Sequence, residues 1–239
     1  MAVGPVGQGF ATFFGPGSPL SQAQGIGLDG PASEADLDAL DAFFDAHSAA
    51  PSVEVASLAD PGLLPALCQR GYHVAEQTHV LARALPGVDP LHGMADGLNI
   101  SRVREDDATA RAACSRAVLR GFFDGPDEPP EAMLEVIDAM TAAAGASLWF
   151  ARVGDAPAAG ATLLIHDRLA MFAGDATVPE FRRRGVQCAL IAARLAEAAR
   201  LGCDAAVACT QPGSGSQRNY ERMGFRLVYC RTLMNRAPR

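Results

Sequence analysis

The spacing of apolar residues from residue 98 onward constrains the fold more than any other feature of this 239-residue chain. It changes repeatedly between the two-residue period of strands and the 3.6-residue period of helices. The expected order is β α α β β β α β α β. Strands are expected at 98–104, 148–153, 161–165, 169–178, 205–209 and 225–234, and helices at 106–119, 132–144, 186–200 and 217–223. Gly121 and Gly202 are expected to end the first and third of these helices, because glycine is common just after a helix.

A segment rich in proline and glycine between Ala84 and Gly97 has neither period and marks a boundary. It predicts two domains, residues 1–88 and residues 97–239. The glycine-rich start at residues 4–30 is expected to form strands, because five of its apolar side chains need burial. These side chains are Phe10, Phe13, Phe14, Ile26 and Leu28.

The first domain looks like an incomplete copy of the end of the second. At an offset of 153 residues, Gly71 aligns with Gly224 and Arg83 aligns with Arg236. The preceding elements repeat the order α β α β, with a capped helix at 33–46 and a short strand at 53–55. We infer an internal duplication.

The charge composition excludes several chemistries. The net charge is −7, and all 20 basic residues are arginine, so the chain has no lysine. A pyridoxal-phosphate Schiff base, an amine-nucleophile aldolase, a Walker-type phosphate loop and a protein-kinase site each need a lysine and are excluded. Eight acidic residues precede the first basic residue, Arg70, so no nucleic-acid-binding surface is expected at the N-terminus.

Neither the six cysteines nor the five histidines have the spacing of a metal site. We therefore expect reduced thiols, no metal and a cytoplasmic location. The N-terminus lacks the basic region of a signal peptide, and no run reaches the roughly 18 to 20 apolar residues of a membrane span. No membrane association is expected.

The most informative segment is Thr177-Val-Pro-Glu-Phe-Arg-Arg-Arg-Gly-Val-Gln-Cys188, which lies between an expected strand and an expected helix. Unpaired N–H groups at a helix N-terminus and the helix dipole both favour an anion, and three arginines add attraction. Pyrophosphate is the natural ligand of such a site. The alternative is a solvated basic turn without a ligand.

A second segment, Asn219-Tyr-Glu-Arg-Met-Gly-Phe225, follows 34 residues after Gly185. Together the two segments resemble the GNAT superfamily of acetyl-CoA-dependent N-acetyltransferases. The run Arg182-Arg183-Arg184-Gly185-Val186-Gln187 is similar to its Q/R-x-x-G-x-G/A loop, except that Gln187 replaces the final Gly or Ala. The resemblance covers residues 98–236. It implies an α/β (α+β) fold with a mixed, mostly antiparallel central sheet flanked by helices, and a partial, degenerate GNAT-like N-terminal half, as in tandem members.

The resemblance also implies which residues bind acetyl-CoA. The end of the fourth strand, Ala176, Thr177 and Val178, would hydrogen-bond the pantetheine arm. Asn219 and Arg222 would lie along the cofactor. The pyrophosphate would be held by the amides of Arg183, Arg184, Gly185, Val186, Gln187 and Cys188. Gln187 puts a side chain where the family usually has a small residue, which affects how tight this loop can be.

Tyr220 matches the family's general acid. A phenol with a pKa near 10 can return a proton to the leaving thiolate. The alternative is a packed aromatic residue whose hydroxyl finds a partner. Three candidates for the general base are left open: Asp175, the pair His166 and Asp167, and a chain of water molecules. His166 and Asp167 also fit a plain hairpin turn.

Three further features have both a functional and a structural interpretation. Cys188 begins the pyrophosphate helix, but we expect a buried thiol rather than an activated one. The loop at 122–131 either attracts a cationic amine or is simply solvated. Its acids are Asp124, Asp127, Glu128 and Glu131. In the first half Leu67 stands where Tyr220 would align, and no arginine loop precedes the helix, so that half lacks the phosphate site and the acid.

The function that the resemblance implies is direct transfer of an acetyl group from acetyl-CoA to a primary amine, with backbone N–H groups of the fourth strand stabilising the oxyanion. The alternative is a non-catalytic acyl-CoA-binding sensor or interaction module. A third interpretation is a protein that binds another phosphorylated ligand. The acceptor, a small-molecule or peptide amine, is not identified, and the oligomeric state is open, a homodimer included.

Overall fold

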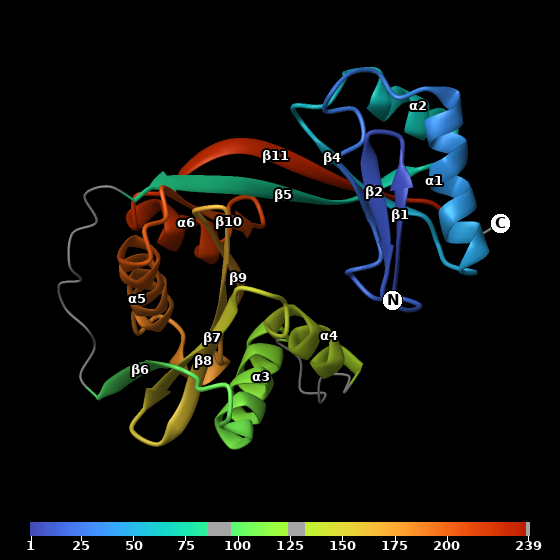
Figure 1. Cartoon of the computed structure of the whole chain (residues 1–239). Coiled ribbons are helices and arrows are strands. Elements are labelled where there is room, and N and C mark those ends of the chain that lie inside the picture. The colour runs from blue at the N-terminus through green and yellow to red at the C-terminus, as the bar shows by residue number, and fades with distance from the viewer. Residues whose placement is uncertain (86–96, 124–131, 238–239) are drawn as a thin grey trace. The chain divides into compact units, whose positions relative to one another are not determined.

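A computed structural model describes residues 1–85, 97–123 and 132–237 of the chain (Figure 1). The chain divides into two compact units, Met1–Val80 with Leu227–Arg239, and Leu81–Arg226. The division falls within strand β5 (His73–Ala84) and at the start of strand β11 (Arg226–Asn235). This division follows the contacts between residues, whereas the sequence predicts two domains from the boundary segment rich in proline and glycine.

The first unit is a sheet covered by two helices. Its strand order is β1-β2-β3-β4-β11-β5. Helix α1 begins with a capping box between Ser33 and Asp36 and buries the apolar face formed by Leu37, Leu40 and Phe44. Besides β5 and β11, the elements of this unit are β1 (Ala2–Val6), β2 (Gly9–Phe13), β3 (Ala23–Gln24), α1 (Glu34–Ala46), β4 (Ser52–Ala56) and α2 (Leu63–Gln69).

The glycine-rich start forms strands, as predicted, but the expected burial of its apolar residues is partly wrong. Ile26 is buried, whereas Phe10, Phe14 and Leu28 are 46%, 39% and 48% exposed. Neighbouring residues of a strand point to opposite faces, and Ala11 takes the core-facing position in β2. Phe10 therefore points away from the core.

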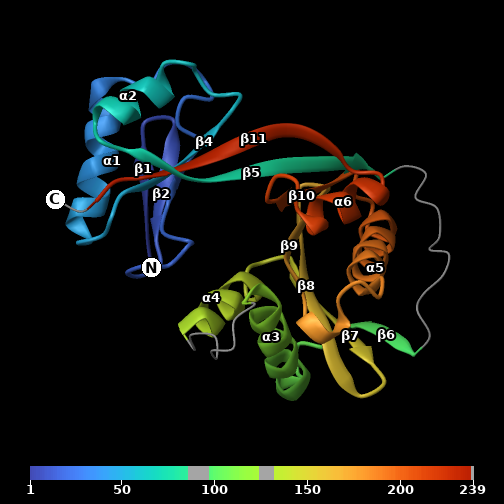
Figure 2. The ribbon, with the colours of Figure 1, turned by 180° about the vertical axis from the view of Figure 1, so that it is seen from behind.

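The second unit has the strand order β10-β9-β8-β7-β6, in which only β9 and β10 are parallel. The views in Figures 1 and 2 show α3 and α4 on one face of this sheet and α5 on the other. The order of elements from β6 to β11 is the predicted one. The elements are β6 (Leu98–Arg102), α3 (Ala108–Phe122), α4 (Ala132–Thr141), β7 (Ala146–Val153), β8 (Ala156–His166), β9 (Leu169–Thr177), η1 (Pro179–Phe181), α5 (Val186–Arg200), β10 (Ala205–Thr210) and α6 (Gly215–Arg222).

Gly121 does not end α3, as the sequence suggests, because the helix continues to Phe122. A Cβ atom at Gly121 would lie 2.6 Å from Cβ of Ala176 and 2.9 Å from the amide nitrogen of Thr177. The missing side chain lets α3 pack directly on the end of β9. Gly202, by contrast, follows α5 with a φ of +79°, as expected for a terminating glycine.

No helix in the described residues is long and apolar enough to cross a membrane.

Candidate active site

Strands β9 and β10 part in the second unit. Their parallel ladder runs from Leu169 with Ala205 to Phe172 with Ala208. Beyond it, β9 continues to Thr177. Within the described part of the chain, the end of β9 therefore has a ladder partner only in β8. Among the described residues, the N–H and C=O groups on the opposite edge have no strand partner, and of these the Thr177 carbonyl accepts from Nε of Arg182.

A β-bulge lies in this open part of β9. On β8 one residue separates Gly160 from Thr162, whereas on β9 two residues separate their partners, Ala176 and Ala173. The extra residue falls next to Gly174, whose φ of +63° lies in the region that favours glycine. The bulge shifts the alternation of the side chains that follow it.

Because of this shift, Asp175 lies on the same face of β9 as Phe172. Both side chains contact Arg194 of α5, which is fully buried. The Arg194 guanidinium lies 4.4 Å from the centre of the Phe172 ring. Its Nη1 and Nη2 atoms donate to the two carboxylate oxygens of Asp175 at 2.6 Å and 2.5 Å. Arg194 and Asp175 thus form a bidentate pair at the start of the open edge.

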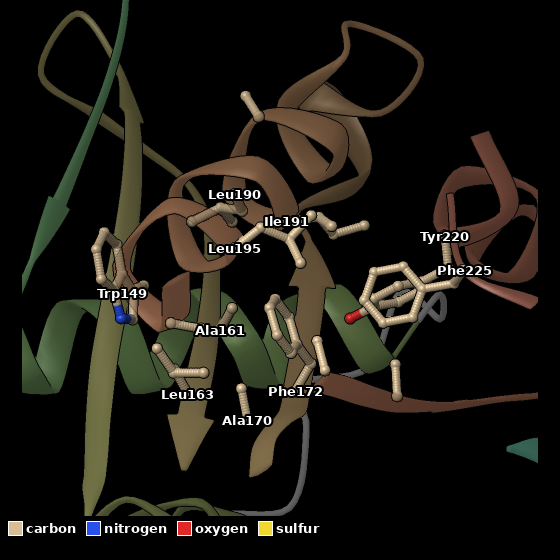
Figure 3. Packing of buried hydrophobic residues seen from close by; sticks show 14 of the residues in the cluster. Trp149, Ala161, Leu163, Ala170, Phe172, Leu190, Ile191, Leu195, Tyr220 and Phe225 are labelled. Atoms are coloured by element: carbon tan, nitrogen blue, oxygen red, sulfur yellow. The ribbon is translucent and has the colours of Figure 1, made fainter. Parts of the chain in front are cut away.

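Tyr220 of α6 joins this pair. Its hydroxyl donates a hydrogen bond to Oδ2 of Asp175, and only 2% of the residue is exposed. Figure 3 shows the ring beside Phe225, with the hydroxyl directed toward Phe172. Burial first, and the neighbouring Asp175 carboxylate second, raise the pKa of Tyr220 well above its ordinary value, although Arg194 acts in the opposite direction. The phenol is therefore protonated throughout the neutral range.

The arginine-rich turn leads from β9 into α5. Gly185, with a φ of +76°, is the N-cap of α5, and the first intrahelical bond runs from the Ala189 N–H to the Gly185 carbonyl. The N–H groups of Val186, Gln187 and Cys188 precede that bond and have no partner inside the helix. They lie at the positive end of the helix dipole. This turn can hold an anion such as pyrophosphate.

The three arginines of the turn have different roles. Arg182 donates from Nε to the Thr177 carbonyl at 3.1 Å and from Nη2 to the Gly121 carbonyl at 2.8 Å. It fixes the turn to β9 and α3. Arg183 has a left-handed φ of +61°, and the Arg184 guanidinium lies 5.5 Å from the ring of Phe181. Arg183 and Arg184 are both exposed and available to a ligand.

Gln187, the residue that departs from the family pattern, connects α5 to α6. Its Nε2 donates to Oγ of Ser216 at 2.8 Å, and its Oε1 accepts from Nδ2 of Asn219 at 2.7 Å. Arg222 donates from Nη1 to Oδ1 of Asn219 at 2.9 Å. The structure thus brings Gln187, Asn219 and Arg222, three of the predicted cofactor residues, into one hydrogen-bonded row.

Cys188 is half-buried, and burial raises the pKa of its thiol more than Arg222 lowers it. This agrees with an unactivated thiol. His166 ends β8, and Asp167 and Arg168 form the exposed turn to β9, with φ values of +44° and +62°. The acids Asp124, Asp127, Glu128 and Glu131 lie outside the described residues. Among the residues that the structure does describe, no cluster of side chains suits a metal ion.

Arg194 is a residue of this site that the sequence did not predict. One signal was available: it follows Leu190 by four residues and Ile191 by three, so it must lie on the buried face of α5. A buried arginine needs a carboxylate partner. The bulge that supplies this partner is not visible in the spacing of β9.

Comparisons with known proteins agree with this geometry. The sequence model of the acetyltransferase (GNAT) family matches residues 114–225. A comparison with curated proteins found no match. Among solved structures, the chain is similar to a GCN5-related N-acetyltransferase from Kribbella flavida, at 21% identity over 98% of this chain and 89% of that chain, with a TM-score of 0.73.

Two other solved structures show the same fold. One is a GCN5-related N-acetyltransferase from Sphaerobacter thermophilus, at 17% identity over 80% of this chain and 60% of that chain, with a TM-score of 0.61. The other is a tandem GNAT protein from the clavulanic acid biosynthesis pathway, at 14% identity over 92% of this chain and 75% of that chain, with a TM-score of 0.65. Residues 114–225 of this chain therefore match the acetyltransferase (GNAT) family model, and the mixed, mostly antiparallel sheet flanked by helices is the fold of these GNAT structures.

Proposed function

We propose that the protein transfers an acetyl group from acetyl-CoA directly to a primary amine. The observation that carries this proposal is the open edge of β9, which leads through an arginine-rich turn into the N-terminus of α5. An extended pantetheine arm can pair with an open strand edge, and a pyrophosphate fits a helix N-terminus flanked by arginines.

The residues present suit acetyl-CoA. Thr177 lies on the open edge of β9 between Ala176 and Val178, and its N–H group is available to the pantetheine arm, whereas its carbonyl accepts from Arg182. The amides from Arg183 to Cys188 offer donors to the pyrophosphate, and the row of Gln187, Asn219 and Arg222 flanks the same helix end. Bound acetyl-CoA would supply the activated thioester.

Within this proposal, N–H groups on the open edge of β9 stabilise negative charge on the thioester oxygen. Tyr220 gives a proton to the departing sulfur. Both carboxylate oxygens of Asp175 already accept hydrogen bonds from Arg194 or Tyr220, so we assign it no role as the base. We propose that water molecules deprotonate the amine. The acceptor class stays a small-molecule or peptide amine.

We also propose that the first part of the chain is a degenerate copy. At the offset of 153 residues, α1 aligns with α5, β4 with β10, α2 with α6 and β5 with β11, each within two residues at either end. Arg83 donates to the Met223 carbonyl beside Gly224, and Arg236 lies 3.8 Å from the position of a Cβ atom on Gly71. The two arginines aligned by the offset thus pack beside the two aligned glycines. Matching contacts of this kind support a duplication.

A non-catalytic acyl-CoA-binding module is the second candidate. The observation that favours it is the burial of Tyr220 and the engagement of its hydroxyl with Asp175. Such a module would bind acetyl-CoA without releasing free thiol in the presence of any amine.

The first experiment is calorimetric titration with acetyl-CoA, followed by an amine panel in which free CoA thiol is measured. The double variant Arg183→Ala, Arg184→Ala is expected to bind about tenfold more weakly or worse, because it removes two charged donors. The matched control, Arg104→Ala with Arg116→Ala, removes the same charge from exposed positions elsewhere in the unit and should bind as the wild type does. Absence of binding by the wild-type protein would contradict both candidate functions, whereas binding without turnover would favour the second.

A further inference from the structure

Arg194 is held at the junction of four elements around the open edge of β9. Its Nε donates to the Leu190 carbonyl in α5 at 3.1 Å, and its Nη1 donates to the Thr162 carbonyl in β8 at 3.1 Å. Its other bonds reach Asp175 in β9, and through Asp175 they reach Tyr220 in α6. A buried guanidinium is costly unless its donors are satisfied, so this arrangement has one favoured geometry.

Asp175 is the centre of the arrangement. Oδ1 accepts from Arg194, while Oδ2 accepts from both Arg194 and Tyr220. The carboxylate follows Gly174 in the bulge, so the same contacts that hold it also hold the bulged backbone. The position of the open edge and the position of the Tyr220 hydroxyl are therefore set together.

We propose that Arg194 and Asp175 are positioning residues for acyl transfer, which fix the Tyr220 hydroxyl and the bulged edge of β9 in one arrangement. This inference rests on the proposed function. Neither residue needs to touch the substrate. In the resting protein Asp175 accepts the hydrogen bond from the Tyr220 hydroxyl. The bidentate guanidinium of Arg194 prevents the carboxylate from turning away from the edge.

The first unit supplies a matched control. There the Tyr72 hydroxyl donates to Oδ1 of Asp41 at 2.7 Å, and Nη1 of Arg236 donates to Oδ2 of Asp41 at 2.7 Å. Both Asp41 and Tyr72 are buried. The same three residue types thus make similar bonds in the unit without the arginine-rich turn, although Arg236 binds Asp41 through one oxygen only and Nη1 of Arg70 also lies 3.5 Å from Oδ2 of Asp41. A purely structural role predicts equal consequences of equivalent substitutions in the two sets.

The test compares Asp175→Asn with Asp41→Asn. Both variants keep an acceptor oxygen and lose a charge, and both are expected to lower the thermal midpoint. Only Asp175→Asn is expected to lower kcat, by about 10- to 100-fold, with the KM for acetyl-CoA changed less than about threefold. The alkaline limb of its kcat profile should also move to lower pH, because the carboxylate that raises the pKa of Tyr220 has been neutralised. Equal kcat values in the two variants, compared per folded molecule, would overturn the proposal.

A second measurement does not need turnover. The buried hydroxyl protons of Tyr220 and Tyr72 should each give a downfield proton resonance in water, assigned by the variants Tyr220→Phe and Tyr72→Phe. Arg194→Lys keeps the charge but loses the fork, and it is expected to shift or broaden the Tyr220 resonance while leaving the Tyr72 resonance in place. An unchanged Tyr220 resonance in Arg194→Lys would refute the positioning role. Failure of the wild type to bind acetyl-CoA would instead refute the proposed function.

Discussion

Replacement of Tyr220 by phenylalanine is the sharpest test of the chemistry, because the chain contains its own control. Tyr220 and Tyr72 are 2% and 3% exposed, and each hydroxyl donates to a carboxylate that also accepts from an arginine. In both positions the ring contacts survive the substitution. Tyr220 keeps its contact with Phe225 at 4.9 Å between ring centres, and Tyr72 keeps the Arg236 guanidinium at 5.0 Å from its ring centre.

The cost in stability should be similar for the two variants. Each loses one buried hydrogen bond to a charged acceptor, which corresponds to about 1.5 to 3 kcal/mol. For a protein of this size, the thermal midpoint should fall by roughly 2 to 4 °C for each kcal/mol. Loss of a general acid lowers kcat by about 10²- to 10⁴-fold, and only Tyr220→Phe should show this effect.

The assay measures free CoA thiol with the best amine of the panel, at a temperature where both variants are folded. Tyr72→Phe should retain the kcat of the wild type. A Tyr220→Phe variant that also retained it would refute the acid role and leave the hydroxyl of Tyr220 as a packing feature. A loss of activity equal in the two variants would show that stability, and not proton transfer, explains the effect.

Three further predictions concern the fold. Gly160→Ala should destabilise by about 1 to 3 kcal/mol in urea unfolding, because its Cβ would lie 2.5 Å from Cγ2 of Val118. Gly215→Ala should not, because its Cβ would lie 3.9 Å from Nη2 of Arg218, an ordinary contact distance. Burial raises the pKa of the Cys114 thiol to about 12, so a thiol reagent at pH 8 should label Cys114 only after unfolding. Burial also raises the pKa of Glu54 above its ordinary 4.5, more than Arg231 lowers it, so the folded state binds a proton more tightly than the unfolded state. Stability should therefore decrease as pH rises from about 4.5 through the folded pKa, and Glu54→Gln should remove this slope, as thermal midpoints between pH 4 and 7 would show.

The sequence predicted the fold class and the order of elements correctly where periodicity and end signals agree. The predicted range of α5, 186–200, is the observed one, because its apolar positions recur every three or four residues and Gly202 terminates it. Gly121 misled the prediction of α3, because a glycine that ends a helix and one that permits close packing look identical in a sequence. Only the partner strand, here β9 at Ala176, distinguishes the two.

Local patterns predict contacts within one element better than contacts between elements. The segments around Gly185 and Tyr220 were identified from their residues, and their roles stay predictions. The partnership of Asp175 with Arg194 depends on a bulge that adds one residue to β9, and this reverses the face that alternation assigns to Asp175. No spacing rule finds such a reversal, although Gly174 is the kind of residue that permits it.

The two buried ionic sets, one around Asp175 and one around Asp41, have similar packing but different surroundings. Asp41 and Arg194 occupy aligned positions in α1 and α5, and each is buried against a tyrosine and a partner of opposite charge. Such a set is therefore a packing solution that does not by itself indicate an active site. The helix N-termini differ: α1 begins with the acidic Glu34 and Asp36, which repel an anion, whereas α5 follows three arginines. The case for acyl transfer consequently depends on the open edge of β9 and the arginine-rich turn, and the catalytic role that we propose for Tyr220 depends on its position beside them.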